Sequence, residues 1–215
     1  MRIAPLAGLA AAAVLAALVA GPAAAAITIT VYNTDLPLPA GQLMVEDFDH
    51  PLAAGFSFTQ NAGAYVRSGA LGLDPGISAP PPGDTSNYET VLSGGLATLT
   101  STRALRAFSF YLGSPDSWNT VRFYGTGGLV ASLSGAQIWG STTGDNGDQG
   151  WGRRVSYDFG GAVVNRIEFA SSGNSFEFDS LAAAPAPEPA VWAMMILGLG
   201  AVGAALRRRR VAAFA

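Results

Sequence analysis

The middle of the chain consists of short segments in which apolar and polar residues alternate. β-Branched and aromatic residues dominate these segments, and Gly, Pro, Asn, Asp and Ser separate them. Such alternation places one face of a strand in the core and the other in solvent. The segments predicted to form strands are 27–32, 88–93, 96–100, 106–112, 120–125, 129–135, 153–159, 164–170 and 175–182.

This pattern predicts an all-β domain over residues 27–183. No internal stretch keeps an apolar period of about 3.6 residues, which argues against helices in the domain. Gly127-Gly128 separates two predicted strands and indicates a tight hairpin turn. Residues 74–87 hold too many prolines for a central strand and are expected to form a long loop. Many short strands with frequent turns favour an antiparallel β-sandwich with a jelly-roll-like topology.

The N-terminus has the pattern of a secretory signal peptide over residues 1–26. An arginine supplies a positive charge, an apolar run follows over residues 6–20, and Ala24 and Ala26 form an A-x-A cleavage site. Such a segment is too short and wrongly flanked for a stable membrane anchor. We therefore expect cleavage after Ala26, which makes Ile27 the first residue of the exported protein.

A second apolar segment lies near the C-terminus, after a Pro/Ala linker at residues 184–190. It spans residues 191–206 and would reach about 24 Å as a helix at about 1.5 Å per residue. A bilayer core is about 30 Å thick, so we expect a short transmembrane helix. The tail at 207–215 is predicted to be cytoplasmic, because it begins with a basic cluster. This cluster consists of Arg207, Arg208, Arg209 and Arg210.

The linker and the apolar segment together resemble the PEP-CTERM sorting signal in its PEPxxWA variant. The motif positions hold Pro187, Glu188, Pro189, Trp192 and Ala193, and the apolar segment and the arginine cluster follow in order. The resemblance implies a Gram-negative surface protein whose inner-membrane-anchored precursor is processed by an exosortase, typically alongside exopolysaccharide production. An ordinary C-terminal membrane anchor is the alternative, but such an anchor requires neither Pro-Glu-Pro nor a fixed tryptophan.

The composition of the domain excludes several classes of function. The domain holds fourteen acidic residues, seven arginines and no lysine, which gives a net charge of −7. Such a surface repels phosphates, so we exclude a nucleic-acid partner. The chain has no cysteine, which excludes disulfides and thiolate metal sites and leaves stability to packing.

Acidic residues near the start and end of the domain are candidate metal ligands. Asp47 and Asp49 follow Glu46, and Asp179 lies in the last predicted strand. The first and last strands of a jelly roll often lie together, so these carboxylates could hold a structural Ca²⁺, which takes about six to eight oxygen ligands. The alternative is that the acids lie on a solvated strand face.

A polar loop between two tryptophans is a candidate glycan-binding site. Trp139 and Trp151 bracket the loop, and Asp145, Asn146 and Asp148 lie at its tip. Aromatic faces stack on sugar rings while acids and amides bond to hydroxyls. The alternative, which we favour, is that both tryptophans pack at the ends of the sheets and the loop serves no binding role.

The sequence predicts no catalytic residue. His50 is the only histidine, and no serine in a G-x-S-x-G elbow accompanies it. A non-enzymatic surface or matrix protein associated with extracellular polysaccharide is therefore the leading hypothesis. A lectin-like module that uses the loop between Trp139 and Trp151 is the alternative. The order of the later strands also looks similar to that of carbohydrate-binding-module-like sandwiches, which is a likeness of architecture alone. A secreted hydrolase is the third hypothesis.

Overall fold

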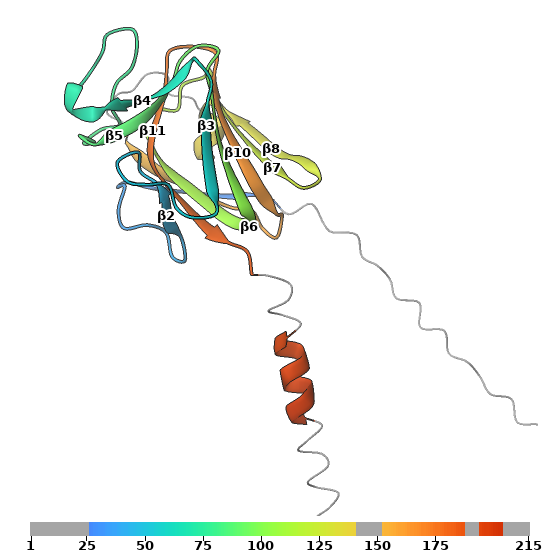
Figure 1. Cartoon of the computed structure of the whole chain (residues 1–215). Helices are drawn as coiled ribbons and strands as arrows, with labels where there is room; N and C mark the ends of the chain where they lie inside the picture. The colour runs from blue at the N-terminus through green and yellow to red at the C-terminus, as the bar shows by residue number, and fades with distance from the viewer. Residues whose placement is uncertain (1–25, 141–151, 188–193, 204–215) are drawn as a thin grey trace, which may run out of the picture.

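The computed structural model describes residues 26–140, 152–187 and 194–203. Within these residues, eleven strands and two short 3₁₀ helices form the domain (Figure 1). The elements are β1 (Thr28–Tyr32), β2 (Leu43–Glu46), β3 (Phe56–Gln60), β4 (Ala64–Ser68), η1 (Gly69–Leu71), β5 (Asn87–Val91), β6 (Leu96–Leu112), β7 (Asn119–Gly125), β8 (Gly128–Ser134), η2 (Gly135–Trp139), β9 (Arg153–Asp158), β10 (Val164–Ser171) and β11 (Phe176–Pro185).

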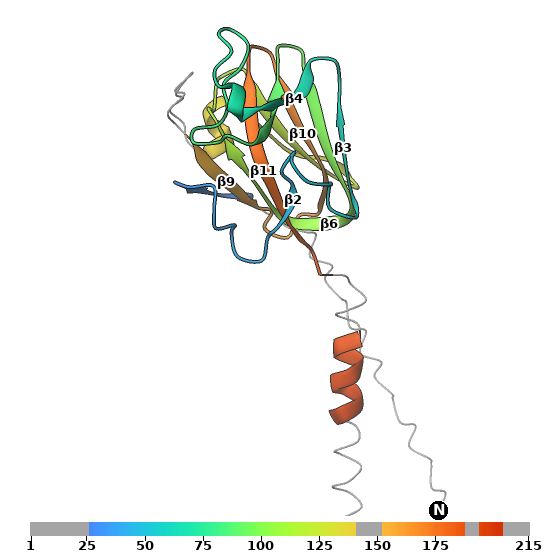
Figure 2. The ribbon, with the colours of Figure 1, turned by 60° about the vertical axis from the view of Figure 1, so that its left-hand side comes forward.

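The strands form an antiparallel β-sandwich in which one long strand, β6, belongs to both layers (Figures 1 and 2). The first half of β6 pairs with β3 and β10, and β7 and β8 extend that layer. The second half pairs with β9 and β11. β1 then joins β9, whereas β5 and β2 join β11, and β4 joins β5. The predicted antiparallel sandwich is therefore confirmed.

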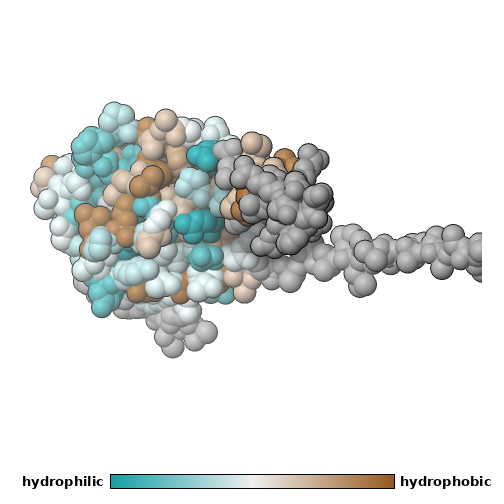
Figure 3. All heavy atoms as spheres, turned by 90° about the horizontal axis from the view of Figure 1, so that it is seen from below, coloured by the Kyte–Doolittle hydropathy of each residue, from teal (hydrophilic) through white to brown (hydrophobic). Residues whose placement is uncertain are grey.

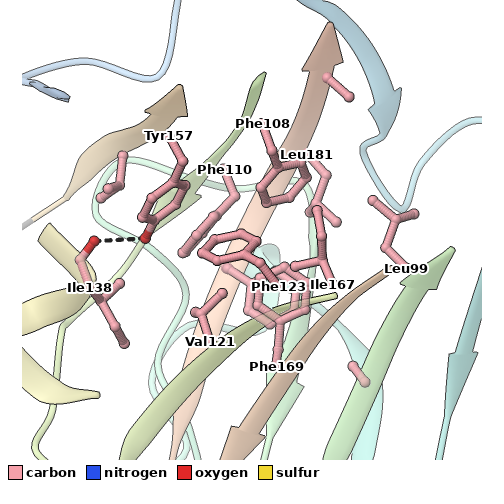
Figure 4. Packing of buried hydrophobic residues seen from close by; sticks show 14 of the residues in the cluster. Leu99, Phe108, Phe110, Val121, Phe123, Ile138, Tyr157, Ile167, Phe169 and Leu181 are labelled. Atoms are coloured by element: carbon pink, nitrogen blue, oxygen red, sulfur yellow. Dashed lines mark hydrogen bonds between the residues drawn. The ribbon is translucent and has the colours of Figure 1, made fainter. Parts of the chain in front are cut away.

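Aromatic side chains from the two layers meet in the core (Figure 4). The ring of Phe169 on β10 stacks on Phe178 of β11 with centroids 4.1 Å apart. Phe123 on β7 faces Tyr157 on β9 at 4.8 Å. Such close aromatic pairs bury large apolar areas, so they stabilise a domain that has no disulfide. The buried hydroxyl of Tyr157 donates to the carbonyl of Ile138 at 2.6 Å, which satisfies its one polar atom.

The sequence-based strand assignment is right for every predicted strand but incomplete. The segments 96–100 and 106–112 are one continuous strand, β6, and the hairpin predicted at Gly127-Gly128 joins β7 to β8. Three strands, β2, β3 and β4, were not predicted. Each is only four or five residues long, so its alternation is hard to distinguish from that of the surrounding loops.

The outer face of β11 is covered by loops rather than exposed to solvent. Phe176 and Phe178 point into the core, so the alternating residues Glu177 and Asp179 lie on the opposite face. Both carboxylates are nevertheless buried, at 3% and 4% exposure. The connection between β4 and β5, which contains the predicted long loop, and the connections that flank β2 supply this cover.

The remaining surface shows no single apolar face in the view from below. Figure 3 shows hydrophobic residues in small groups among hydrophilic ones on that side. Large apolar residues that are exposed on the domain include Leu36, Leu43, Leu71 and Leu73. Scattered apolar residues of this kind are ordinary on a folded domain and indicate no binding face by themselves.

Candidate functional site

A cavity of about 320 Å³ over the outer face of β11 is lined by aspartates from four separate segments. We call it the acidic cavity, and its five acidic residues are Asp35, Asp47, Asp49, Asp84 and Asp179. The sequence predicted Asp47, Asp49 and Asp179 to lie together, and the structure brings all three to this cavity. Asp35 and Asp84 were missed because each is an isolated acid in a loop, with no neighbouring acids to draw attention to it.

Strand register fixes the floor of the acidic cavity. Arg154 of β9 lies opposite Tyr111 of β6, and Tyr111 lies opposite Asp179 of β11. Residues in register on neighbouring antiparallel strands share a face, so these three side chains form one row under the loops. The Tyr111 hydroxyl donates to the carbonyl of Pro82 at 2.7 Å and attaches the long loop to this row.

Among the described residues, one of the five aspartates has a buried positive partner. The guanidinium of Arg154, which is completely buried, forms an ion pair with Asp35. It also donates through Nη1 to the Ser109 hydroxyl at 2.9 Å. The second oxygen of Asp35 accepts from the Ser180 hydroxyl at 3.0 Å. The carboxylate of Asp35 is therefore neutralised and fully hydrogen-bonded.

Asp84 and Asp179 face each other across the hydroxyl of Ser86. That hydroxyl bonds to Oδ1 of Asp84, and it lies 3.4 Å from Oδ2 of Asp179. Among the described residues, no donor reaches the buried oxygens Oδ2 of Asp84 and Oδ1 of Asp179. Burial, and then the neighbouring charges of Asp84 and Asp35, raise the pKa of Asp179 to about 8. Ser86 and Ser180 donate to the other oxygens of these two residues, so each carboxyl group keeps one buried oxygen without a partner among the described residues.

Asp47 and Asp49 lie at the rim of the cavity and make local hydrogen bonds. Oδ1 of Asp47 accepts from the backbone N–H of His50 at 2.9 Å, and its Oδ2 pairs with the exposed imidazole of His50 at 2.8 Å. The hydrogen bond and charge of Asp47 raise the pKa of His50. Asp49 accepts from the backbone N–H of Asn87 at 3.3 Å. His50 therefore fixes a turn at the surface.

Within the described parts of the chain, no three Asp, Glu or His side chains already form a group that could hold a metal ion. Any cation in the acidic cavity would take its remaining ligands from hydroxyl groups, backbone carbonyls and water. Such mixed oxygen sets are usual for Ca²⁺.

A second cavity, of about 250 Å³, lies over the same strand at Glu177. We call it the Trp118 cavity, and its lining includes Asp116, Trp118, Asn174, Ser175 and Glu177. Glu177 accepts from the backbone N–H of Ala79 at 3.2 Å and from the Ser175 hydroxyl. Burial, with a contribution from Asp116, raises the pKa of Glu177 to about 7.

Sequence reasoning also missed the Trp118 cavity. Trp118 lies in the turn that leads into β7, and Glu177 alternates with core phenylalanines on β11. The indole Nε1 of Trp118 is buried and has no hydrogen-bond partner among the described residues. The one available signal in the sequence was the alternation of acids with phenylalanines at the start of β11. This alternation predicts carboxylates on the face opposite the core.

The predicted glycan loop is only partly described. Trp139 ends η2 and is half-buried against the hydrophobic core, an arrangement that favours a packing role for this residue. Asp145, Asn146, Asp148 and Trp151 lie outside the described residues.

The predicted sorting and cleavage signals also lie largely outside the described residues. Ala26, Ile27 and Pro187 are described, whereas Ala24, Glu188, Pro189, Trp192, Ala193 and Arg207–Arg210 are not. Of the predicted membrane segment at 191–206, residues 194–203 form an exposed helix (Figure 1). In the part of the chain that the structure describes, no helix is both long and apolar enough to span a bilayer.

The solved structures that match this chain are distant from it in sequence and only loosely superimposable. The cleaved K2 adhesin domain of Lys-gingipain is 14% identical with a TM-score of 0.41, and the match covers 66% of this chain and 99% of that one. The family 11 carbohydrate-binding module of cellulase Lic26A-Cel5E of Clostridium thermocellum is 15% identical with a TM-score of 0.33, covering 70% and 98%. No function follows for this chain from similarities this low. Comparison with curated proteins returned no match.

A family model matches the end of the chain. The match covers residues 185–210 and begins where β11 ends, so it contains the linker, the apolar segment and the arginine cluster. This agrees with the resemblance found in the sequence. The motif implies export and an anchored precursor that an exosortase processes. The chain therefore carries a C-terminal PEP-CTERM protein-sorting motif.

Proposed function

We propose that the mature product is a non-enzymatic protein of the cell surface or extracellular matrix, released by exosortase and associated with exopolysaccharide. The observation that carries this proposal is the position of the sorting motif relative to the folded domain. β11 ends at Pro185, the backbone N–H of Ala186 donates to Ala104 at 2.7 Å, and Pro187 is already exposed. Cleavage at the motif would therefore leave the sandwich whole.

The test is processing in a host that contains exosortase. We expect the wild-type chain to lose residues 190–215, whereas Glu188→Ala should remain a larger, membrane-bound species. Asp158→Asn, which changes an exposed acid on β9, is the matched control and should be processed normally. Intact-mass measurement distinguishes the two forms. Retention of residues 190–215 on the wild-type surface protein would contradict the proposal, as would turnover of polysaccharide or ester substrates.

We also assign the sandwich to the jelly-roll class. β2, near the start of the domain, pairs with the last strand β11, and this pairing supports the assignment. The membrane step rests on the apolar segment at 191–206, which contains the described helix at 194–203.

Glycan binding at the Trp118 cavity is a second candidate function. A half-buried indole beside the buried carboxylates of Asp116 and Glu177 matches the needs of a sugar ring, which presents apolar C–H faces and hydroxyl groups. The Trp118 cavity is thus an alternative glycan-binding site to the loop between Trp139 and Trp151, and unlike that loop it lies among the described residues.

Co-sedimentation with insoluble polysaccharides tests this second candidate. Glu177→Gln and Trp118→Phe should each weaken binding at least about tenfold, because the first replaces a carboxyl group by an amide and the second removes the indole N–H. Trp139→Phe, which changes the other described indole near the strand ends, should leave binding within about twofold if the Trp118 cavity is the site. Equal loss in all three variants would contradict this location.

A further inference from the structure

We propose that the acidic cavity binds Ca²⁺ and that Asp84 and Asp179 are its charged ligands. The ion would join the outer face of β11 to the loops that cover it. This inference is independent of the sorting motif and of glycan binding.

Two buried carboxylate oxygens at the acidic cavity lack a hydrogen-bond partner among the described residues. Asp179 is only 4% exposed and lines the cavity, and its Oδ1 has no hydrogen-bond partner among the described residues. Oδ2 of Asp84, on the loop that covers β11, is in the same condition. A buried carboxylate oxygen without a partner is costly, since it has lost its water and gained nothing in exchange. A cation between the two residues would remove that cost for both.

The described lining of the acidic cavity carries an excess of negative charge. Five aspartates line the cavity, and none of the described residues that line it is basic. Arg154 reaches the floor from β9, but its guanidinium is committed to Asp35 and Ser109. Its charge also acts on Asp179, but among the described residues no basic side chain forms an ion pair with Asp84 or Asp179. A divalent cation would supply this counter-charge, and Asp47 and Asp49 at the rim would add long-range attraction.

The ligand atoms at the cavity indicate which kind of cation would bind. The polar groups that line the cavity are carboxylate, hydroxyl and backbone oxygens, including the hydroxyl of Ser86 between the two ligands. His50 does not line the acidic cavity, so none of the described residues that line it supplies an imidazole nitrogen. Oxygen donors suit hard cations, and Ca²⁺ accepts about six to eight of them in flexible geometry, with water completing the set. Mg²⁺ requires a tighter octahedral arrangement.

The proposed ligands differ from those expected from the sequence. Both oxygens of Asp47 are bonded in its own turn, and Asp49 accepts from the backbone of Asn87. Asp84 and Asp179 are the aspartates with an oxygen still free among the described residues of the cavity. The proposal therefore keeps the strand-based expectation for Asp179 and replaces its two rim partners with Asp84.

The experiment uses the full chain after treatment with a chelator, titrated with calcium chloride or magnesium chloride and followed by calorimetry and thermal melting. We expect one Ca²⁺ per chain and a rise in the melting temperature, with a much smaller response to Mg²⁺. Asp84→Asn and Asp179→Asn should each weaken Ca²⁺ binding more than about tenfold, because each replaces a charged ligand by a neutral amide. Asp158→Asn, an exposed aspartate on β9, should bind within about twofold of the wild type.

A second measurement keeps the proposal testable independently of folding defects. In chelator, both Asn variants should melt at a temperature equal to or higher than the wild type, because each replaces a carboxyl group that has an unpartnered buried oxygen by a neutral amide. In Ca²⁺ the order should reverse. The absence of a Ca²⁺ effect on the wild type would overturn the proposal. Unchanged affinity in both Asn variants, or an equal response to Mg²⁺, would also overturn it.

Discussion

The completely buried guanidinium of Arg154 forms an ion pair with Asp35, which lies in the loop after β1. Its Nε also donates to the backbone carbonyl of Asp35 at 2.5 Å. Burial lowers the pKa of Arg154, and the charge of Asp35 opposes that shift. One residue of β9 thus holds the first loop of the domain against the outer face of the sheet.

Replacing this arginine should destabilise the domain strongly. Arg154→Met keeps the length of the side chain but leaves the Asp35 carboxylate without its partner. We expect the free energy of unfolding to fall by about 3–5 kcal/mol, as for other buried ion pairs that lose one member. Arg166→Met is the control, because Arg166 is 45% exposed and should cost less than about 1 kcal/mol. Chemical denaturation measures both, and similar losses would contradict the structural role of Arg154.

Glu89 should make stability depend on pH. Its side chain is fully buried beside Gln60, and burial raises its pKa from 4.5 to about 8. Between these pH values the folded chain holds a proton that the unfolded chain has released. This group's contribution to the free energy of unfolding therefore falls by about 1.4 kcal/mol per pH unit and levels off above pH 8.

The variant Glu89→Gln removes this titration while keeping the shape of the side chain. Relative to the wild type, it should gain about 2–4 kcal/mol of stability between pH 5 and pH 8. Gln60→Ala keeps the carboxyl group of Glu89. Its free energy of unfolding relative to the wild type should therefore show no such gain between pH 5 and pH 8. Denaturant titrations across the pH range provide the test, and a constant difference between Glu89→Gln and the wild type would contradict the assignment.

Trp139 should contribute to stability more than to binding. It packs against the core at the end of η2, so Trp139→Ala should cost about 3 kcal/mol, near the lower end of the range for buried aromatic residues. Thermal or chemical unfolding gives the value. If the variant melted like the wild type but lost affinity for polysaccharide, the predicted glycan platform would be supported instead.

The exported protein should begin at Ile27. β1 starts at Thr28, which lies opposite Asp158 of β9. Cleavage after Ala26 would therefore leave every residue of this strand in place. N-terminal sequencing of the exported chain measures the result. Retention of residues 1–26, or a cut inside β1, would contradict the prediction.

The sequence by itself determined the parts that rest on local chemistry. Alternation on strands such as β7 and β10 predicted the sandwich, because side-chain direction along a strand depends only on position. The order Pro-Glu-Pro, apolar segment and arginine cluster predicted the sorting motif, since its parts are contiguous in the chain.

Tertiary structure decided what lies in the cavities. Asp84 approaches Asp179 only because the connection between β4 and β5 folds back over β11, and no local pattern in a proline-rich loop encodes that return. Arg154, Tyr111 and Asp179 form one row only through the pairing of β9, β6 and β11. Contacts of this kind depend on strand order and register, which are properties of the whole sheet. The sequence therefore identifies the acidic residues, but it does not reveal which of them are buried together with an oxygen that lacks a hydrogen-bond partner.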